Sequence, residues 1–378
     1  MKRSRYTSDA ARTARALKSL EGRVTDLEES TRSQDDPVAV HRESWHGLSS
    51  VFDQFWLRVF DRDEVDQTLD DEGEERDWDE LSDDRKAYYL ANSDYQNVHG
   101  ISEAIMHEES VTWLSNTLAP NGEHLPARKL AFGSGTPDVS SDTVLDDPHS
   151  ETGSIPGGIV RDSRADLELF LDFDQISGPI TEVEIYAESG ERLIFAEIET
   201  EFSLDNRAIW GRVVTNFEAD TAVAEDALDD LDEDDETTPT IGETYLPLQH
   251  IISHRLTPAS SADPPREARV GVGTYRDVDE NLDEPIGTVP ITRVDTFDDD
   301  LRFTAYVDPA KFNGEEVTQW GIRNGDYDEN SLVDAWTYPL YTKAEIDPAV
   351  EKTDYESINL VARFIFDWGA TEDPETVE

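Results

Sequence analysis

Two histidines, His250 and His254, stand four residues apart in a stretch with helical spacing. At this spacing two imidazoles share one face of a helix, which is an arrangement that can bind a metal ion. Zinc proteases with this spacing also carry a catalytic glutamate between the histidines, but here the intervening residues are Ile251, Ile252 and Ser253. We therefore interpret His250 and His254 as structural or surface histidines.

Acidic residues are the second group that could do chemistry. Asp277, Asp279, Glu280 and Asp283 crowd one loop and could bind calcium, although the spacing and the glycine of an EF-hand are absent. Carboxylates are so frequent in the chain that no pair stands out as a glycosidase acid and base. The chain has no cysteine, and no Ser-His-Asp set can be argued. We expect no enzyme activity and no cofactor, apart from weak binding of Ca²⁺, Mg²⁺, Na⁺ or K⁺ on acidic loops.

A Gly-x-Gly-Thr pattern occurs twice and could suggest a phosphate-binding loop. A dinucleotide fingerprint needs a third glycine and a following helix, whereas Pro137 and Tyr275 follow the two patterns here. A tight exit from an edge strand is a better interpretation, because glycine tolerates positive φ and close approach of another backbone. The residues concerned are Gly133, Gly135 and Thr136 in the first copy and Gly271, Gly273 and Thr274 in the second.

These two patterns belong to a longer internal repeat. Residues 113–136 align without a gap with residues 251–274, and 8 of the 24 positions are identical. The similarity continues downstream, where AIWGRVVTNF (208–217) matches NLVARFIFDW (359–368). The sequence therefore predicts a duplicated domain.

Each copy has the pattern of a helix, a loop bounded by proline and then several strands with partial period-2 alternation. We expect an α+β protein in which an N-terminal coiled-coil or helical region precedes two tandem antiparallel β-sandwich domains, each introduced by a helix. The predicted divisions are a coiled-coil helix (1–36), a helical region (37–100), a first repeat (101–222), an acidic linker (223–242), a second repeat (243–370) and an acidic tail (371–378).

The N-terminal arm is basic, unlike the rest of the chain, and its apolar residues alternate at spacings of three and four, which favours a coiled coil. An amphipathic helix that packs on its own domain remains an alternative. If the helix self-associates, for example as a trimer, its basic tip is expected to dock on an acidic partner. The predicted seam residues are Ala10, Thr13, Leu17, Leu20, Val24 and Leu27. In the next region, the pairs Val51-Phe52, Phe55-Trp56 and Val59-Phe60 predict one apolar face of a helix.

Composition indicates the medium in which the chain folds. Asp and Glu number 86 against 32 Lys and Arg, so the net charge is -54. At molar salt the Debye length is only about 3 Å, which screens this repulsion. A halophilic protein is the favoured interpretation over an acidic disordered one, because 8 Trp, 12 Tyr and 14 Phe supply a core. Acidity argues against nucleic-acid binding, and the absence of a long apolar stretch argues against membrane insertion.

The order of motifs in the first copy (FGSGT, SDTVLDDP, ITEVEIY and ERLIFAEI) resembles the attachment and collar domains of tail proteins in tailed viruses. The second copy keeps Gly271, Gly273, Thr274, Leu282 and Thr318. The resemblance implies a virion component at the tail tip, baseplate or fibre of a haloarchaeal virus, made in the host cytoplasm and bound to other tail proteins. The alternatives are an adhesin that binds a host glycan or S-layer, on the virion or the cell surface, and a carbohydrate-active enzyme on a β-sandwich.

Overall fold

The computed structural model describes residues 38–63, 65–66, 77–94, 97–120, 122–136, 139–140, 142–205, 207–229, 231, 239–258, 264–276, 281–297, 300–324, 340–368 and 371–372. The predicted coiled coil, with its seam from Ala10 to Leu27, lies outside these residues. Within the described ranges, no helix is long and apolar enough to cross a membrane.

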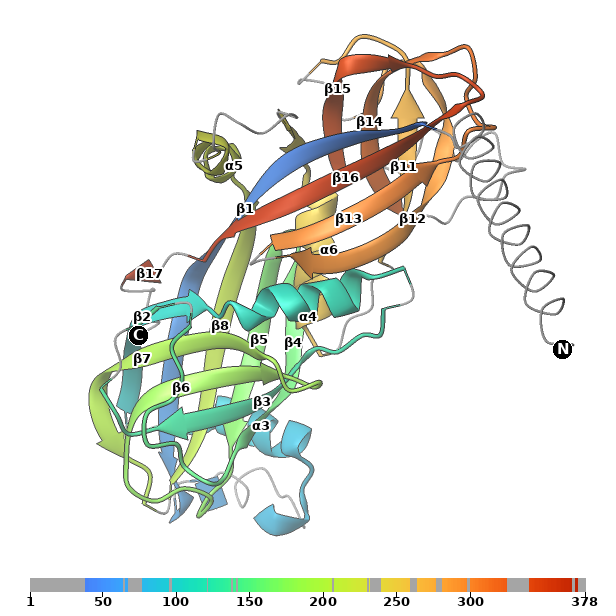
Figure 1. Ribbon diagram of the computed structural model, residues 1–378. Coiled ribbons are helices and arrows are strands. Elements are labelled where there is room, and N and C mark those ends of the chain that lie inside the picture. Colours follow the sequence, from blue (N-terminus) through green and yellow to red (C-terminus); the bar gives the residue numbers. More distant parts are fainter. Residues whose placement is uncertain are drawn as a thin grey trace, which may run out of the picture.

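One strand of 24 residues, β1 (Val38–Asp61), belongs to both halves of the molecule. Its first half pairs in parallel with β16 (Glu356–Asp367), and its second half pairs antiparallel with β8 (Arg207–Ala219). Gly47 lies where the partner changes, and a Cβ added there would stand 1.7 Å from the backbone oxygen of Asp220. Only glycine fits this crossing, and Figure 1 shows β1 running from one half of the molecule into the other.

The second half of β1 completes an eight-stranded antiparallel barrel, here called the first barrel. Its strand order is β1–β2–β7–β6–β3–β4–β5–β8, and β8 pairs back with β1. Closure leaves the barrel without an unpaired edge. The remaining strands are β2 (Asn97–Met106), β3 (Ala127–Gly133), β4 (Gly153–Arg161), β5 (Arg164–Leu171), β6 (Pro179–Ala187) and β7 (Arg192–Ser203).

The first half of β1 takes part in a second ring of strands, here called the second barrel. Its order is β1–β16–β13–β12–β11–β14–β15–β10. The ring closes through β9, which pairs in parallel with β1 and is joined to β10 by Gly242. The strands are β9 (Thr240–Ile241), β10 (Glu243–Thr244), β11 (Pro265–Gly271), β12 (Pro285–Phe297), β13 (Asp300–Val307), β14 (Glu316–Asn324) and β15 (Thr342–Glu351). A two-residue strand, β17 (Thr371–Glu372), pairs with β2.

The strands that the sequence alignment matches take equivalent places in the two barrels. The run β7–β6–β3–β4–β5–β8 in the first barrel corresponds to β15–β14–β11–β12–β13–β16 in the second. Each repeat supplies its own strands, and β1 fills the remaining place in both rings. Two barrels therefore share one strand, and neither closes without it.

The predicted α+β class with two β-sandwiches is wrong, because the structure is mostly β and its strands close into a barrel. A sandwich has two separate sheets with free edges, whereas β1 here pairs with both β2 and β8. The prediction of a helical region over 37–100 is also wrong, since all 24 residues of β1 and the beginning of β2 fall within it. The paired apolar residues such as Phe55-Trp56 are buried on both faces of a strand instead of one face of a helix.

Four α-helices are assigned within the described residues: α3 (Asp83–Asn92), α4 (Glu109–Leu118), α5 (Thr221–Asp229) and α6 (Leu246–Leu256), together with a 3₁₀ turn, η1 (Trp78–Glu80). The helix expected at the start of the first repeat (residue 101) begins only at Glu109, because residues up to Met106 belong to β2. The acidic segment predicted as a linker begins within α5, whose Ala224 is fully buried. Helices α4 and α6 directly precede the equivalent strands β3 and β11.

Candidate assembly site

The Gly-x-Gly-Thr loop of the first repeat is held by side chains of β6. The Thr181 hydroxyl donates to the carbonyl oxygen of Gly135 at 2.7 Å. The neighbouring Glu182 accepts, through Oε2, a hydrogen bond of 2.8 Å from the backbone N–H of Asp146. One strand thereby fixes both ends of the loop that leaves β3.

The second repeat builds the same connections. The Thr318 hydroxyl donates to the carbonyl oxygen of Gly273 at 2.6 Å. Gln319 accepts from the Asp283 N–H at 3.3 Å and donates through Nε2 to the Asp283 carbonyl at 2.9 Å. The structure therefore places the matched glycines and threonines of the two copies in equivalent surroundings.

Close packing explains the glycines at both loops. A Cβ on Gly135 would lie 2.2 Å from Cβ of Asp146, and a Cβ on Gly273 would lie 2.6 Å from Cβ of Asp283. Distances below 3.0 Å require something to move. The atoms that approach these two glycines belong to side chains, and neither glycine is among the residues with positive φ. Among the described residues, no helix follows either loop before the next strand, so neither loop opens a helix that could bind phosphate.

Glu182 and Gln319 occupy equivalent positions but differ in their hydrogen bonds. Both side chains are fully buried, but Gln319 both accepts from and donates to the backbone of Asp283. In Glu182, Oε1 has no hydrogen-bond partner among the described residues. Burial raises the pKa of Glu182 above its ordinary value; the N–H of Asp146 opposes this rise, and the Asp146 carboxylate adds to it. The first repeat therefore buries a carboxyl group where the second has a neutral amide.

Glu184 lies two residues further along β6 and links three elements. The Tyr186 hydroxyl donates to Oε2 of Glu184, and Nε of Arg192 lies 3.3 Å from Oε1. Arg192 also binds Glu109, in the first turn of α4, with an N···O distance of 2.7 Å. Burial raises the pKa of Glu184 to about 7, and burial together with this carboxylate raises the pKa of Tyr186 to about 12. Such a carboxyl can exchange protons near neutral pH, but its side chain is only 1% exposed, which closes it to a substrate.

Helices α4 and α6 each pack on the barrel that the other repeat builds. Helix α4, which precedes the strands of the first barrel, packs on β12 and β13 of the second. Helix α6, which precedes the strands of the second barrel, packs on β4, β5 and β8 of the first (Figure 1). A cavity of about 570 Å³ lies beside this seam, lined by residues such as Asn116 at the end of α4 and Arg293 on β12. The exchange and the shared strand couple the barrels into one unit.

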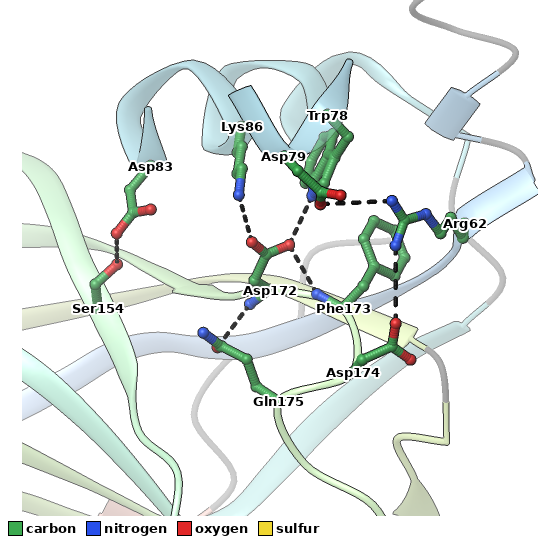
Figure 2. Close-up of polar contacts among 10 residues, drawn as sticks. All are labelled: Arg62, Trp78, Asp79, Asp83, Lys86, Ser154, Asp172, Phe173, Asp174 and Gln175. Atoms are coloured by element: carbon green, nitrogen blue, oxygen red, sulfur yellow. Dashed lines mark hydrogen bonds and ion pairs between the residues drawn. The ribbon is translucent and has the colours of Figure 1, made fainter. Parts of the chain in front are cut away.

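A polar cluster fastens η1 and α3 to the first barrel (Figure 2). The Asp172 carboxylate accepts from Nε1 of Trp78 at 2.6 Å and from Nζ of Lys86 at 2.5 Å. Lys86 is only 7% exposed, so this ion pair is largely removed from solvent. Arg62, nearer the surface, lies 3.5 Å from Asp79. Beneath the cluster, apolar side chains of both parts form a second core: Phe60, Val65, Trp78, Leu81, Ala87, Tyr89, Leu90, Phe170, Phe173 and Ala208.

Few of the residues first considered for chemistry meet in a ligand set. No group of three or more His, Asp or Glu side chains suited to a metal is found within the described ranges. Asp277, Asp279 and Glu280 lie outside those ranges, and Asp283 serves the loop described above. His250 and His254 do meet, on α6 at the seam.

Sequence reasoning missed two functional features, the exchange of helices and the cluster around Glu184. The alternation Glu182-Val183-Glu184 on a strand was the available signal, because acidic residues inside an otherwise apolar strand are usually paired or protonated. The packing of each helix on the barrel of the other repeat leaves no local signal in the sequence, since it depends on long-range contacts. Searches against protein-family models, curated proteins and solved structures found no match to this chain.

Proposed function

We propose that the chain is a structural component of the tail of a virus that infects halophilic archaea, placed at the tail tip, baseplate or fibre attachment. The observation that carries this proposal is the pair of equivalent barrels around one shared strand. Two similar units on one chain let a small number of copies present twice as many similar surfaces. Three copies, for example, would present six, which matches the sixfold symmetry of a tail tube.

The mechanical coupling of the barrels supports a scaffold role. Independent domains on a flexible linker would move relative to each other, whereas β1 and the exchanged helices remove this freedom. The two Gly-x-Gly-Thr loops, held by Thr181 and Thr318, give both units the same local shape. Repeated rigid units are what a closed assembly requires of its subunits.

The partners in this proposal are other copies of the chain and other tail proteins. The net charge of -54 keeps the surface hydrated in concentrated salt and disfavours contact with nucleic acid. The basic N-terminal residues, such as Arg3, Arg5 and Arg12, are expected to bind an acidic neighbour.

Light scattering of the full chain in about 3 M KCl, with electron microscopy of the same sample, tests the proposal. We expect a closed homo-oligomer, most simply a trimer, with six similar lobes in projection. The truncated chain lacking residues 1–36 serves as the matched control and should assemble less tightly. A monomer at micromolar concentration would contradict the assembly, and specific binding of that monomer to halophile cells or S-layer would favour an adhesin instead.

A further inference from the structure

The two histidines on α6 lie closer together than their sequence spacing alone requires. Nε2 of His250 is 2.8 Å from Nε2 of His254, and the two rings meet edge to face with centroids 4.2 Å apart. Both residues are only partly buried, so ions in solution can reach them. The pair therefore presents two imidazole nitrogens to one point at the surface of the seam.

The opposite edge of His250 determines which nitrogen carries its hydrogen. Nδ1 of His250 lies 2.7 Å from the carbonyl oxygen of Asp162, at the tip of the β4–β5 hairpin. A carbonyl oxygen only accepts, so Nδ1 carries the hydrogen and Nε2 of neutral His250 keeps a lone pair. His254 must then donate through Nε2 in the metal-free pair.

Metal-binding histidines commonly have this outer contact, because a carbonyl or carboxylate on one ring nitrogen orients the other toward the metal. The hairpin is itself fixed on α6, since the Ser253 hydroxyl donates to the Ser163 carbonyl at 2.6 Å. The carbonyls of Asp162 and Ser163 thus both bind side chains of the same helix. His250 is held in place before any ion arrives.

We propose that His250 and His254 form a two-histidine chelate for a divalent late transition metal ion, with water in the remaining positions. Imidazole nitrogens suit Ni²⁺, Cu²⁺ and Zn²⁺, whereas Mg²⁺ and Ca²⁺ prefer oxygen. On binding, the hydrogen of His254 moves from Nε2 to Nδ1 through solvent, so that both Nε2 lone pairs face the ion. No net proton is released when both rings start neutral.

The site belongs to the second repeat alone. The equivalent positions on α4 are Thr112 and Asn116, which cannot chelate in this way. Burial lowers the pKa of His254, and the neighbouring His250 and His124 act in the same direction. Arg255 in turn lies near His124. A bound ion would join two successive turns of α6 on the seam where this helix meets the first barrel.

Calorimetric titration of the full chain with Ni²⁺ tests the chelate, because chloride competes only weakly for this ion. The buffer holds about 3 M KCl and an excess of Mg²⁺, which occupies the surface carboxylates. We expect one Ni²⁺ per chain, with affinity that falls as acid protonates the pair. His250→Asn and His254→Gln should each weaken binding by about tenfold or more.

His149→Gln, at a histidine remote from α6 in sequence, is the matched control and should bind Ni²⁺ as the parent does. Unfolding temperatures measured in chelator separate loss of a ligand from loss of the fold, and His254→Gln leaves the contact to Asp162 intact. Equal binding by parent and both α6 variants would overturn the proposal, as would the absence of binding in excess Mg²⁺. Neither result depends on the proposed role in a viral tail.

Discussion

At the scale of single residues, the buried carboxyl groups of β6 distinguish the two repeats. Glu182 and Glu184 lie on the same face of the strand, and burial raises the pKa of both. The equivalent positions in β14 are Gln319 and Gly321, which carry no charge. Protonation of Glu182 and Glu184 is therefore coupled to folding of the first barrel. The equivalent residues of the second barrel do not titrate and provide no such coupling.

Exchange of the side chains at these equivalent positions should change stability in opposite directions. Because the folded-state pKa of Glu182 is raised, its contribution to stability is present below the ordinary value of 4.5 and is lost as pH rises through the folded pKa. Glu182→Gln should therefore raise the free energy of unfolding by about 1 kcal/mol at pH 7 and by less at pH 5. Denaturant unfolding at the two pH values measures this.

The mirror variant is Gln319→Glu, which should destabilise the chain at pH 7 because it buries a carboxyl beside the carbonyl of Asp283. If both variants shifted stability in the same direction, the difference between the two loops would have another origin.

At the scale of elements, the ion pairs that attach η1 and α3 to the first barrel differ in their burial. Lys86 and Asp172 are largely buried and meet at 2.5 Å, whereas Arg62 contacts the more exposed Asp79 at 3.5 Å. A buried charge that loses its partner is costly, while a surface pair contributes little. The two cations in Figure 2 are therefore expected to differ in importance.

Lys86→Met should destabilise the attachment of α3 by about 3 kcal/mol, because Asp172 would keep its charge without its cation. Hydrogen exchange should then quicken across residues 83–92 before the barrels unfold. The matched variant Arg62→Met should change stability by less than about 1 kcal/mol. The double variant Lys86→Met with Asp172→Asn should recover part of the loss, and equal effects of the two single variants would refute the distinction.

At the scale of the whole molecule, charge is distributed very unevenly between surface and interior. Of the few lysines in the chain, Lys86, Lys343 and Lys352 are buried. Lys352, for example, donates to the carbonyls of Pro309 and Thr353. Carboxylates meanwhile give the chain its net charge of -54, whose self-repulsion only dense counterions screen.

Removal of salt should therefore unfold the barrels. When KCl is lowered from about 3 M to about 0.1 M, the Debye length grows from roughly 2 Å to 10 Å, and repulsion between surface carboxylates returns. We expect the midpoint of thermal unfolding, followed by circular dichroism, to fall by tens of degrees. Sucrose at equal osmolality should fail to restore it, because a neutral solute does not screen charge. An unchanged midpoint in dilute salt would show that the acidic surface is not what makes the fold depend on salt.

Several features of this protein follow from the sequence alone, because they depend on local pattern or on composition. The partial alternation in residues 167–173, 181–187 and 208–217 predicts strands. The structure contains strands there, at 164–171, 179–187 and 207–219. The glycines of the two loops are explained by close packing, as their spacing suggested. The high net charge predicts a halophilic protein, and this remains a prediction, as does the viral role that the motifs imply.

Only the tertiary structure decided how these strands close. β1 is buried from both sides where it passes between the barrels, so its apolar residues occur in adjacent pairs that imitate the face of a helix. Without β1 each repeat has two free strand edges, and the partial alternation of its strands is the same in a sandwich as in a barrel. Pairing between residues 150 or more positions apart, such as Leu57 with Gly211, leaves no periodic trace in either segment. Long-range closure, helix exchange and the meeting of His250 with Asp162 are properties of the folded chain.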